Sequence, residues 1–132
     1  GDNSVPSESC TPITTLMVRS IPASFTTADL LRLWPADGSW DLLYLPRRGN
    51  GKGARGYAFM NFVAEDHAAA FRARWQGCRL SQFCTGDGLN ITYADVQGFD
   101  ANLGVLKNKP KGDLKKRDSE PIIILDGKFV SF

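Results

Sequence analysis

Aromatic side chains recur at alternate positions in residues 55–62 (RGYAFMNF). Successive residues of a β-strand point to opposite faces, so a strand here carries Arg55, Tyr57 and Phe59 on one face. Unpaired nucleic-acid bases are flat and stack on exposed aromatic rings, each stack being worth roughly 1–3 kcal/mol. Arg55 begins the strand, where its charge can reach a phosphate or pair with an acid. The pattern predicts a stacking platform, although aromatic rings covered by another element would give the same pattern.

The same eight residues fit the RNP signature of RNA-recognition domains at every specified position. A companion six-residue motif matches residues 16–21 (LMVRSI), with Met17 at a position that is normally aromatic. Methionine can contact a base through its polarizable sulfur, and packing against a neighbour explains Met17 equally well. The opposite face of residues 55–62 is expected to build the core, through Gly56, Ala58, Met60 and Phe62.

Three further aromatic residues have two interpretations each. Tyr93, in a predicted strand at 89–94, is either an additional stacking residue or a core residue, because its segment alternates ambiguously. Tyr44 and Trp40, in a predicted strand at 40–45, present the same alternatives, and we expect Trp40 in the core.

Basic residues are clustered although the net charge is only +2. Ten of the sixteen Lys and Arg residues fall within 47–55 and 107–117. Such clusters can neutralise phosphates, but solvated loops and tails are their commoner explanation. The candidates for phosphate contacts are Arg19, Arg48, Lys52 and Arg55.

The elements that must position these side chains follow from periodicity and from start and stop signals. Thr26 is a good N-cap, and Asp29 three residues later gives a variant capping box. The predicted elements are strands at 14–21, 40–45, 56–63 and 89–94, and helices after Thr26, at 64–75 and at 99–107. This order predicts an α+β fold, the ferredoxin-like β-α-β-β-α-β sandwich. It has a four-stranded antiparallel sheet, two helices on one face and, here, an added C-terminal helix.

The chain is long enough for one domain with tails. We expect a flexible lead-in at 1–12, the domain at 13–108 including the added helix, and a basic tail at 109–132. Asp126-Gly127 predicts a hairpin within 122–131, and Asp87-Gly88 a smaller one. The tail hairpin could form a sheet edge, dock on the sheet or belong to an adjoining region.

Several classes of function are disfavoured. Three cysteines at irregular spacing and a single histidine, His67, suggest neither a disulfide framework nor a metal site, so we expect an intracellular protein with no cofactor. No phosphate-cradling loop or convergent polar set predicts an enzyme. No segment has the length and apolarity of a membrane span or the form of a signal peptide.

Four segments in succession, TTLMVRSIP, WDLLYLP, GYAFMNF and ITYADVQG, resemble the C-terminal RNA-recognition motif of Mei-two-like proteins, regulators of meiosis and differentiation. PIIIL at 121–125 is similar to an apolar segment that follows in that family. The ITYADVQG segment followed by a helix is the part that ordinary RNA-recognition motifs lack. The resemblance implies a regulatory RNA-binding protein, nuclear or cytoplasmic, with this domain as one part of a longer chain.

We therefore predict a monomer that binds single-stranded RNA by aromatic stacking and basic phosphate contacts, in post-transcriptional regulation, with no membrane role. The alternative is a protein-interaction module of the same fold whose sheet face is covered by the C-terminal extension, and protein partners stay open. A peptide-binding variant that uses the helical face usually has an Arg-x-Phe motif after the second helix. Here that stretch is Arg79-Leu80-Ser81.

Overall fold

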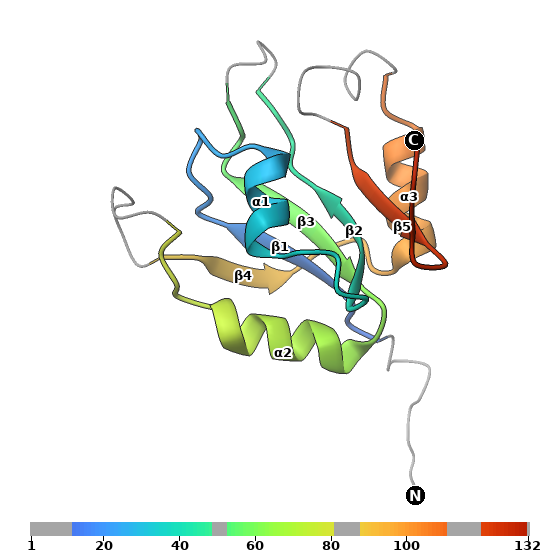
Figure 1. Ribbon diagram of the computed structural model, residues 1–132, viewed down its shortest axis with the longest axis horizontal. Helices are drawn as coiled ribbons and strands as arrows, with labels where there is room; N and C mark the ends of the chain where they lie inside the picture. Colours follow the sequence, from blue (N-terminus) through green and yellow to red (C-terminus); the bar gives the residue numbers. More distant parts are fainter. Residues whose placement is uncertain (1–11, 49–52, 81–87, 111–119, 132) are drawn as a thin grey trace, which may run out of the picture.

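The computed structural model describes residues 12–48, 53–80, 88–110 and 120–131. The predicted lead-in and the predicted turn at 87–88 lie largely outside this part. The elements, in chain order, are β1 (Thr15–Arg19), α1 (Thr27–Leu33), β2 (Trp40–Tyr44), β3 (Tyr57–Phe62), α2 (Glu65–Trp75), β4 (Asn90–Tyr93), α3 (Phe99–Lys107), β5 (Ile122–Leu125) and β6 (Lys128–Val130). The predicted β-α-β-β-α-β order with an added helix is confirmed (Figure 1).

Within the described residues, the sheet has six strands in the order β4-β1-β3-β2-β5-β6, not the four predicted. The two additional strands form the hairpin of the tail, which joins the edge of β2 through pairing of Ile123 with Leu42. Asp126 and Gly127 both have positive φ, 52° and 77°, as a type I′ hairpin turn requires. Of the three arrangements considered for the tail, the structure therefore has the edge hairpin.

Helices α1 and α2 pack on one face of the sheet, which we call the helical face (Figure 1). Helix α1 begins with the predicted capping box, in which Thr26 Oγ1 accepts from Asp29 N and Asp29 Oδ2 accepts from Thr26 N. Trp34 at its end meets Phe71 and Trp75 of α2 edge to face, with ring centroids 5.1 and 5.8 Å apart. The sheet contributes the predicted core residues Ala58, Met60 and Phe62 of β3 and, from β1 and β2, Leu16, Val18, Trp40 and Leu43.

Helix α3 packs on the other face, over β2 and β3. Its Leu106 forms a second buried cluster with Leu42 and Tyr44, and Phe59 and Phe99 pack against this cluster. An irregularity in the pairing of β2 with β3 falls between Trp40 and Leu42. Because of this bulge, Trp40 lies in the core under the helices while Leu42 faces α3.

Side-chain hydrogen bonds fix the connection between β4 and α3 to the start of β1. Gln97 accepts with Oε1 from the N–H groups of Thr14 and Thr15, and its Nε2 donates to the carbonyls of Thr15 and Ala94. Gly98 has φ +100°, a conformation that favours glycine, and its N–H donates to Thr15 Oγ1. This turn carries the chain across to the face opposite α1 and α2.

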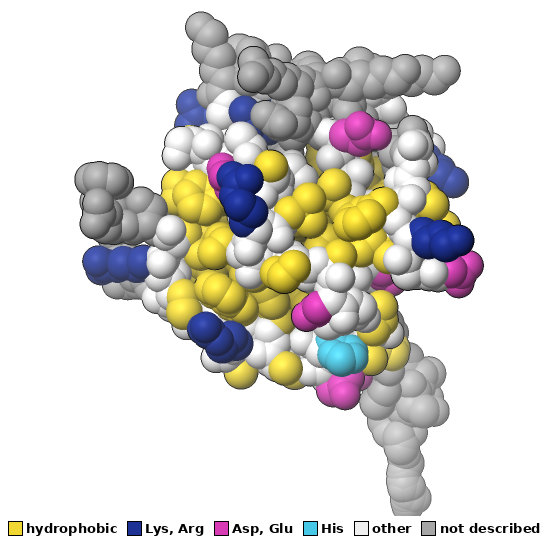
Figure 2. Space-filling model, viewed as in Figure 1, with side chains coloured by type: hydrophobic (Ala, Val, Ile, Leu, Met, Phe, Trp, Pro, Cys, Tyr) yellow, Lys and Arg dark blue, Asp and Glu magenta, His cyan; other side chains and the backbone are white. Residues whose placement is uncertain are grey.

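Figure 2 shows the helical face, where apolar side chains cover a broad area around α1 and α2 and the Lys and Arg side chains are scattered. The basic residues of the described chain are therefore not gathered into a patch on this side. No helix in the described ranges is both long and apolar enough to cross a bilayer.

Candidate nucleic-acid interface

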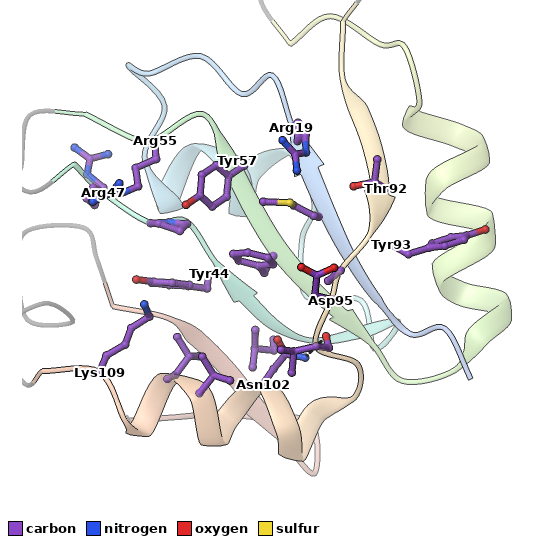
Figure 3. Close-up of a pocket in the computed structure, with 18 residues that line it drawn as sticks. Arg19, Tyr44, Arg47, Arg55, Tyr57, Thr92, Tyr93, Asp95, Asn102 and Lys109 are labelled. Carbon is purple, nitrogen blue, oxygen red and sulfur yellow. Dashed lines mark hydrogen bonds between the residues drawn. The ribbon is translucent and has the colours of Figure 1, made fainter. Parts of the chain in front are cut away.

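A groove of about 650 Å³ lies between α3 and the part of the sheet that α3 leaves uncovered (Figure 3). Its floor is made by β1 and β3, where Met17 pairs with Phe59 and Arg19 with Tyr57. One wall is formed by α3 and the connection that precedes it, with Val96, Asn102, Val105 and Leu106. The structure thus brings together Met17, Arg19, Tyr57 and Phe59, all predicted from the sequence.

The two aromatic rings on the floor are in contact. Tyr57 and Phe59 meet edge to face, with centroids 5.6 Å apart and planes at 81°. Both side chains are half-buried, but their surroundings differ. Phe59 packs against the buried cluster under α3, whereas Tyr57 is not part of that cluster. The ring of Tyr57 therefore lies on the floor outside this cluster, whereas Phe59 also packs beneath α3.

Of the described basic residues, four line the groove: Arg19, Arg47, Arg55 and Lys109. Arg19 and Arg55 are exposed, so both can reach a ligand in the groove. Arg55 is anchored by its Nε, which donates to the carbonyl of Arg47 at 3.2 Å. Arg47 is less exposed than Arg55, and one of its terminal nitrogens donates to the carbonyl of Phe25 at 3.1 Å. Arg47 thus ties the β2–β3 connection to the loop before α1.

Tyr93 does not reach the floor of the groove. Its register partner on β1 is the core residue Leu16, so its side chain leaves the sheet on the helical face. The ring lies 5.5 Å from the guanidinium carbon of Arg72 in α2 and is 60% exposed (Figure 3). The core interpretation of Tyr93 is therefore wrong, whereas its stacking on a base stays a prediction: the side chain borders the groove but leaves the sheet on the face opposite Tyr57.

Of the two loop residues predicted to contact phosphate, Lys52 lies outside the described residues. Arg48 is exposed and is not part of the groove lining. Its backbone N–H donates to the carbonyl of Gly53, which closes the base of the β2–β3 loop.

Other residues of the groove were either left with two interpretations by the sequence, as Tyr44 was, or not identified from it. Tyr44 is only 8% exposed and belongs to the cluster under α3, with Lys109 Nζ 5.9 Å from its ring centre. Thr92 lies beside Met17 on β4. Asp95 lies in the connection, Asn102 in α3 and Lys109 just after α3, and no local pattern assigns these segments to the sheet face.

A buried polar network borders the floor at the α3 end. Asn61 Oδ1 accepts from the hydroxyls of Thr14 and Thr15 at 2.9 and 2.7 Å, and its Nδ2 donates to Asp41 Oδ1 at 2.8 Å. Burial raises the pKa of Asp41 above its usual range, while the hydrogen bond from Asn61 acts in the opposite direction. Within the described ranges, no group of three or more His, Cys, Asp or Glu residues could hold a metal ion.

The β-α-β-β-α-β order, with aromatic residues of its third strand on the face opposite the helices, defines the RNA-recognition-motif class of domain. Residues 13–107 match the family described as RNA recognition motif 2. The chain belongs to this family. Its resemblance to Mei-two-like proteins is also confirmed: it is 30% identical over 116 residues to Protein MEI2-like 1 of Arabidopsis thaliana. That match covers 86% of this chain and 13% of the relative, so the chain spans only a small part of the relative's length.

Solved structures share the fold. The chain is 25% identical to the SXL-lethal protein in a protein–RNA complex, with a TM-score of 0.53 over 64% of this chain and 48% of that one. It is 26% identical to the C-terminal RNA recognition motif of the hypothetical RNA-binding protein RBM19, with a TM-score of 0.52 over 74% of this chain and 88% of that one.

Proposed function

We propose that this chain binds single-stranded RNA in the groove, as a monomer and without catalysis. Bases stack on Tyr57 and Phe59, with Met17 as a further apolar contact, while Arg19 and Arg55 contact phosphates. The observation that carries the proposal is the half-buried ring of Tyr57, which lies on a floor shared with Phe59 and beside two exposed arginines. Stacking tolerates any base, because every base has an apolar face.

The position of α3 limits how much of the sheet can meet RNA. Leu42 and Tyr44 are buried beneath α3, so the β2 side of this face offers a ligand little exposed surface. The surface that α3 does not cover is formed by β1, by the part of β3 that carries Tyr57 and Phe59, and by the edge strand β4. We expect it to accommodate about two or three nucleotides, the usual number stacked by a sheet of this kind.

Family membership supports this function, as does the RNA present in the SXL-lethal complex. The resemblance to Mei-two-like proteins leads us to propose a role in post-transcriptional regulation, in meiosis or differentiation, within the nucleus or cytoplasm. Arg48 and Lys52 remain proposed as phosphate contacts for longer RNA that continues past the β2–β3 loop.

The direct test is fluorescence anisotropy with a labelled pool of short single-stranded RNAs. Tyr57→Ala should weaken binding by about 1–3 kcal/mol, the usual cost of losing one base stack. Phe129→Ala is the matched control, since Phe129 is an aromatic residue on β6 with 64% of its side chain exposed, outside the groove.

Circular dichroism should show both variants folded, and the control should bind like the parent. Failure of the parent to bind the pool, or unchanged binding by folded Tyr57→Ala, would contradict the proposal. A protein ligand for the same face would then become the leading explanation.

A further inference from the structure

The two ends of the groove differ in charge. Arg47 and Arg55 lie at one end, and Asp95 and Asn102 lie toward the other, beside the connection between β4 and α3 (Figure 3). Asp95 is the only acidic side chain among the described residues that line the groove. A carboxylate in a groove that receives a polyanion weakens binding by repulsion, unless the ligand offers a hydrogen-bond donor to it.

Asp95 is held in place by the backbone beside it. The preceding Ala94 is buried, and its N–H donates to the carbonyl of Thr15 at 3.1 Å. The Asp95 side chain is exposed, is directed over the groove and makes no hydrogen bond or ion pair with any described residue (Figure 3). The carboxylate is therefore an acceptor that follows a fixed stretch of backbone and that no described residue satisfies.

Asn102 supplies a second acceptor at the same end. Its side chain is 9% exposed, and its Nδ2 lies 2.8, 3.0 and 3.2 Å from the Gly98 carbonyl, the Val96 carbonyl and Thr15 Oγ1. An amide nitrogen carries only two hydrogens, so its donor capacity is fully used. Its Oδ1 accepts no hydrogen bond from the residues that the structure describes, although Asn102 lines the groove.

Two acceptors at one end of a stacking floor favour one kind of base. Guanine presents N1–H and the 2-amino group side by side, which matches the two oxygens of a carboxylate. Adenine and cytosine each place an acceptor nitrogen next to the amino group, and uracil flanks its single N–H with two carbonyls. We infer that Asp95, assisted by Asn102, makes this groove selective for guanine in single-stranded RNA. This inference rests on the proposed function and assigns its base preference.

The test compares a labelled oligouridine with versions in which one central uridine is replaced by guanosine, inosine, adenosine or cytidine. Inosine keeps N1–H and lacks only the 2-amino group. The guanosine RNA should bind about tenfold more tightly than oligouridine, and inosine should lose most of that gain. Asp95→Asn should bind guanosine and uridine RNAs within about twofold of each other. Its affinity for oligouridine should be retained or slightly increased, because a negative charge is removed.

Asp100→Asn is the matched control, since Asp100 is an exposed acid in the first turn of α3 that does not line the groove. This variant should keep the guanosine preference. Equal binding of the guanosine and uridine RNAs by the parent, or a preference that survives Asp95→Asn, would overturn the inference while RNA binding itself stands. If the parent bound none of the five RNAs, the proposed function would fail, and the base preference with it.

Discussion

Leu106 of α3 and Phe59 of β3 meet in one apolar cluster on the face of the sheet opposite α1 and α2. This contact gives the two aromatic residues of the floor different roles. Phe59 carries part of the packing of α3, whereas Tyr57 contacts Phe59 by its ring edge and stays outside the cluster. The added helix therefore covers part of this face of the sheet and forms one wall of the groove beside it.

Alanine substitutions should separate these roles. Phe59→Ala should lower the free energy of unfolding by about 2 kcal/mol, below the 3–5 kcal/mol typical of fully buried phenylalanines because Phe59 is half-buried. Tyr57→Ala should cost much less stability while weakening RNA binding. Urea denaturation followed by tryptophan fluorescence measures the difference. Equal losses of stability in the two variants would argue against a supporting role for Phe59.

The basic residues of the groove should control the salt dependence of RNA affinity. Removing one phosphate contact lowers the slope of log affinity against log salt by about 0.7 for a single strand. We expect this change for Arg19→Gln and for Arg55→Gln, measured by anisotropy over a range of salt concentrations. Arg74→Gln is the control, because Arg74 lies on α2 and therefore on the helical face, away from the groove. Its guanidinium carbon is 4.6 Å from the Trp75 ring centre. The same change in slope for all three variants would show that only net charge matters.

Gln97 should be needed to hold α3 in place. Gln97→Ala removes four hydrogen bonds to backbone groups of Thr14, Thr15 and Ala94. The loss leaves part-buried backbone groups without a partner. We expect a loss of at least about 2 kcal/mol in the free energy of unfolding, with faster hydrogen exchange in α3. The control, Gln76→Ala, removes a single bond from Ile91 N and should leave exchange in α3 unchanged. Slow exchange in α3 of Gln97→Ala would mean that apolar packing alone holds the helix.

The raised pKa of Asp41, caused first by burial, predicts a specific pH dependence. The folded chain binds this proton more tightly than the unfolded chain, so the free energy of unfolding falls as pH rises from 3.8 through the raised pKa. Asp41→Asn keeps an oxygen acceptor for Asn61 without the charge. The substitution should raise Tm at neutral pH and abolish the decrease in the free energy of unfolding with rising pH. Thermal unfolding from acid to neutral pH measures both effects.

Asp37 is the opposite case and serves as the control. Hydrogen bonds from Ser39, first from its hydroxyl and then from its N–H, lower the pKa of Asp37. Its contribution to stability is present above its unfolded pKa and is lost as pH falls through the lowered value. Asp37→Asn should therefore lower Tm at neutral pH. A lower Tm for Asp41→Asn as well would show that the Asp41 charge stabilises the fold.

The sequence by itself determined the elements and the faces of β3. Alternation is a local property, so residues 55–62 were enough to place Tyr57 and Phe59 opposite Ala58, Met60 and Phe62, and the capping signals at Thr26 and Asp29 were enough to start α1. In β4, Ile91 and Tyr93 fall on one face and Asn90 and Thr92 on the other, but alternation does not show which of the two faces meets the helices. Only its register against β1 put Tyr93 on the helical face.

Tertiary structure decided where the helix and the tail went. An apolar stripe on α3 shows that the helix must pack on something, but it does not show on which face. The bulge near Trp40 and the hydrogen bonds of Gln97 and Gly98 decide the face, and they bring Asp95, Asn102 and Lys109 to a groove whose floor is made by strands distant in sequence. These contacts join segments far apart in the chain, so they form only when the sheet has assembled, and no local pattern could reveal them.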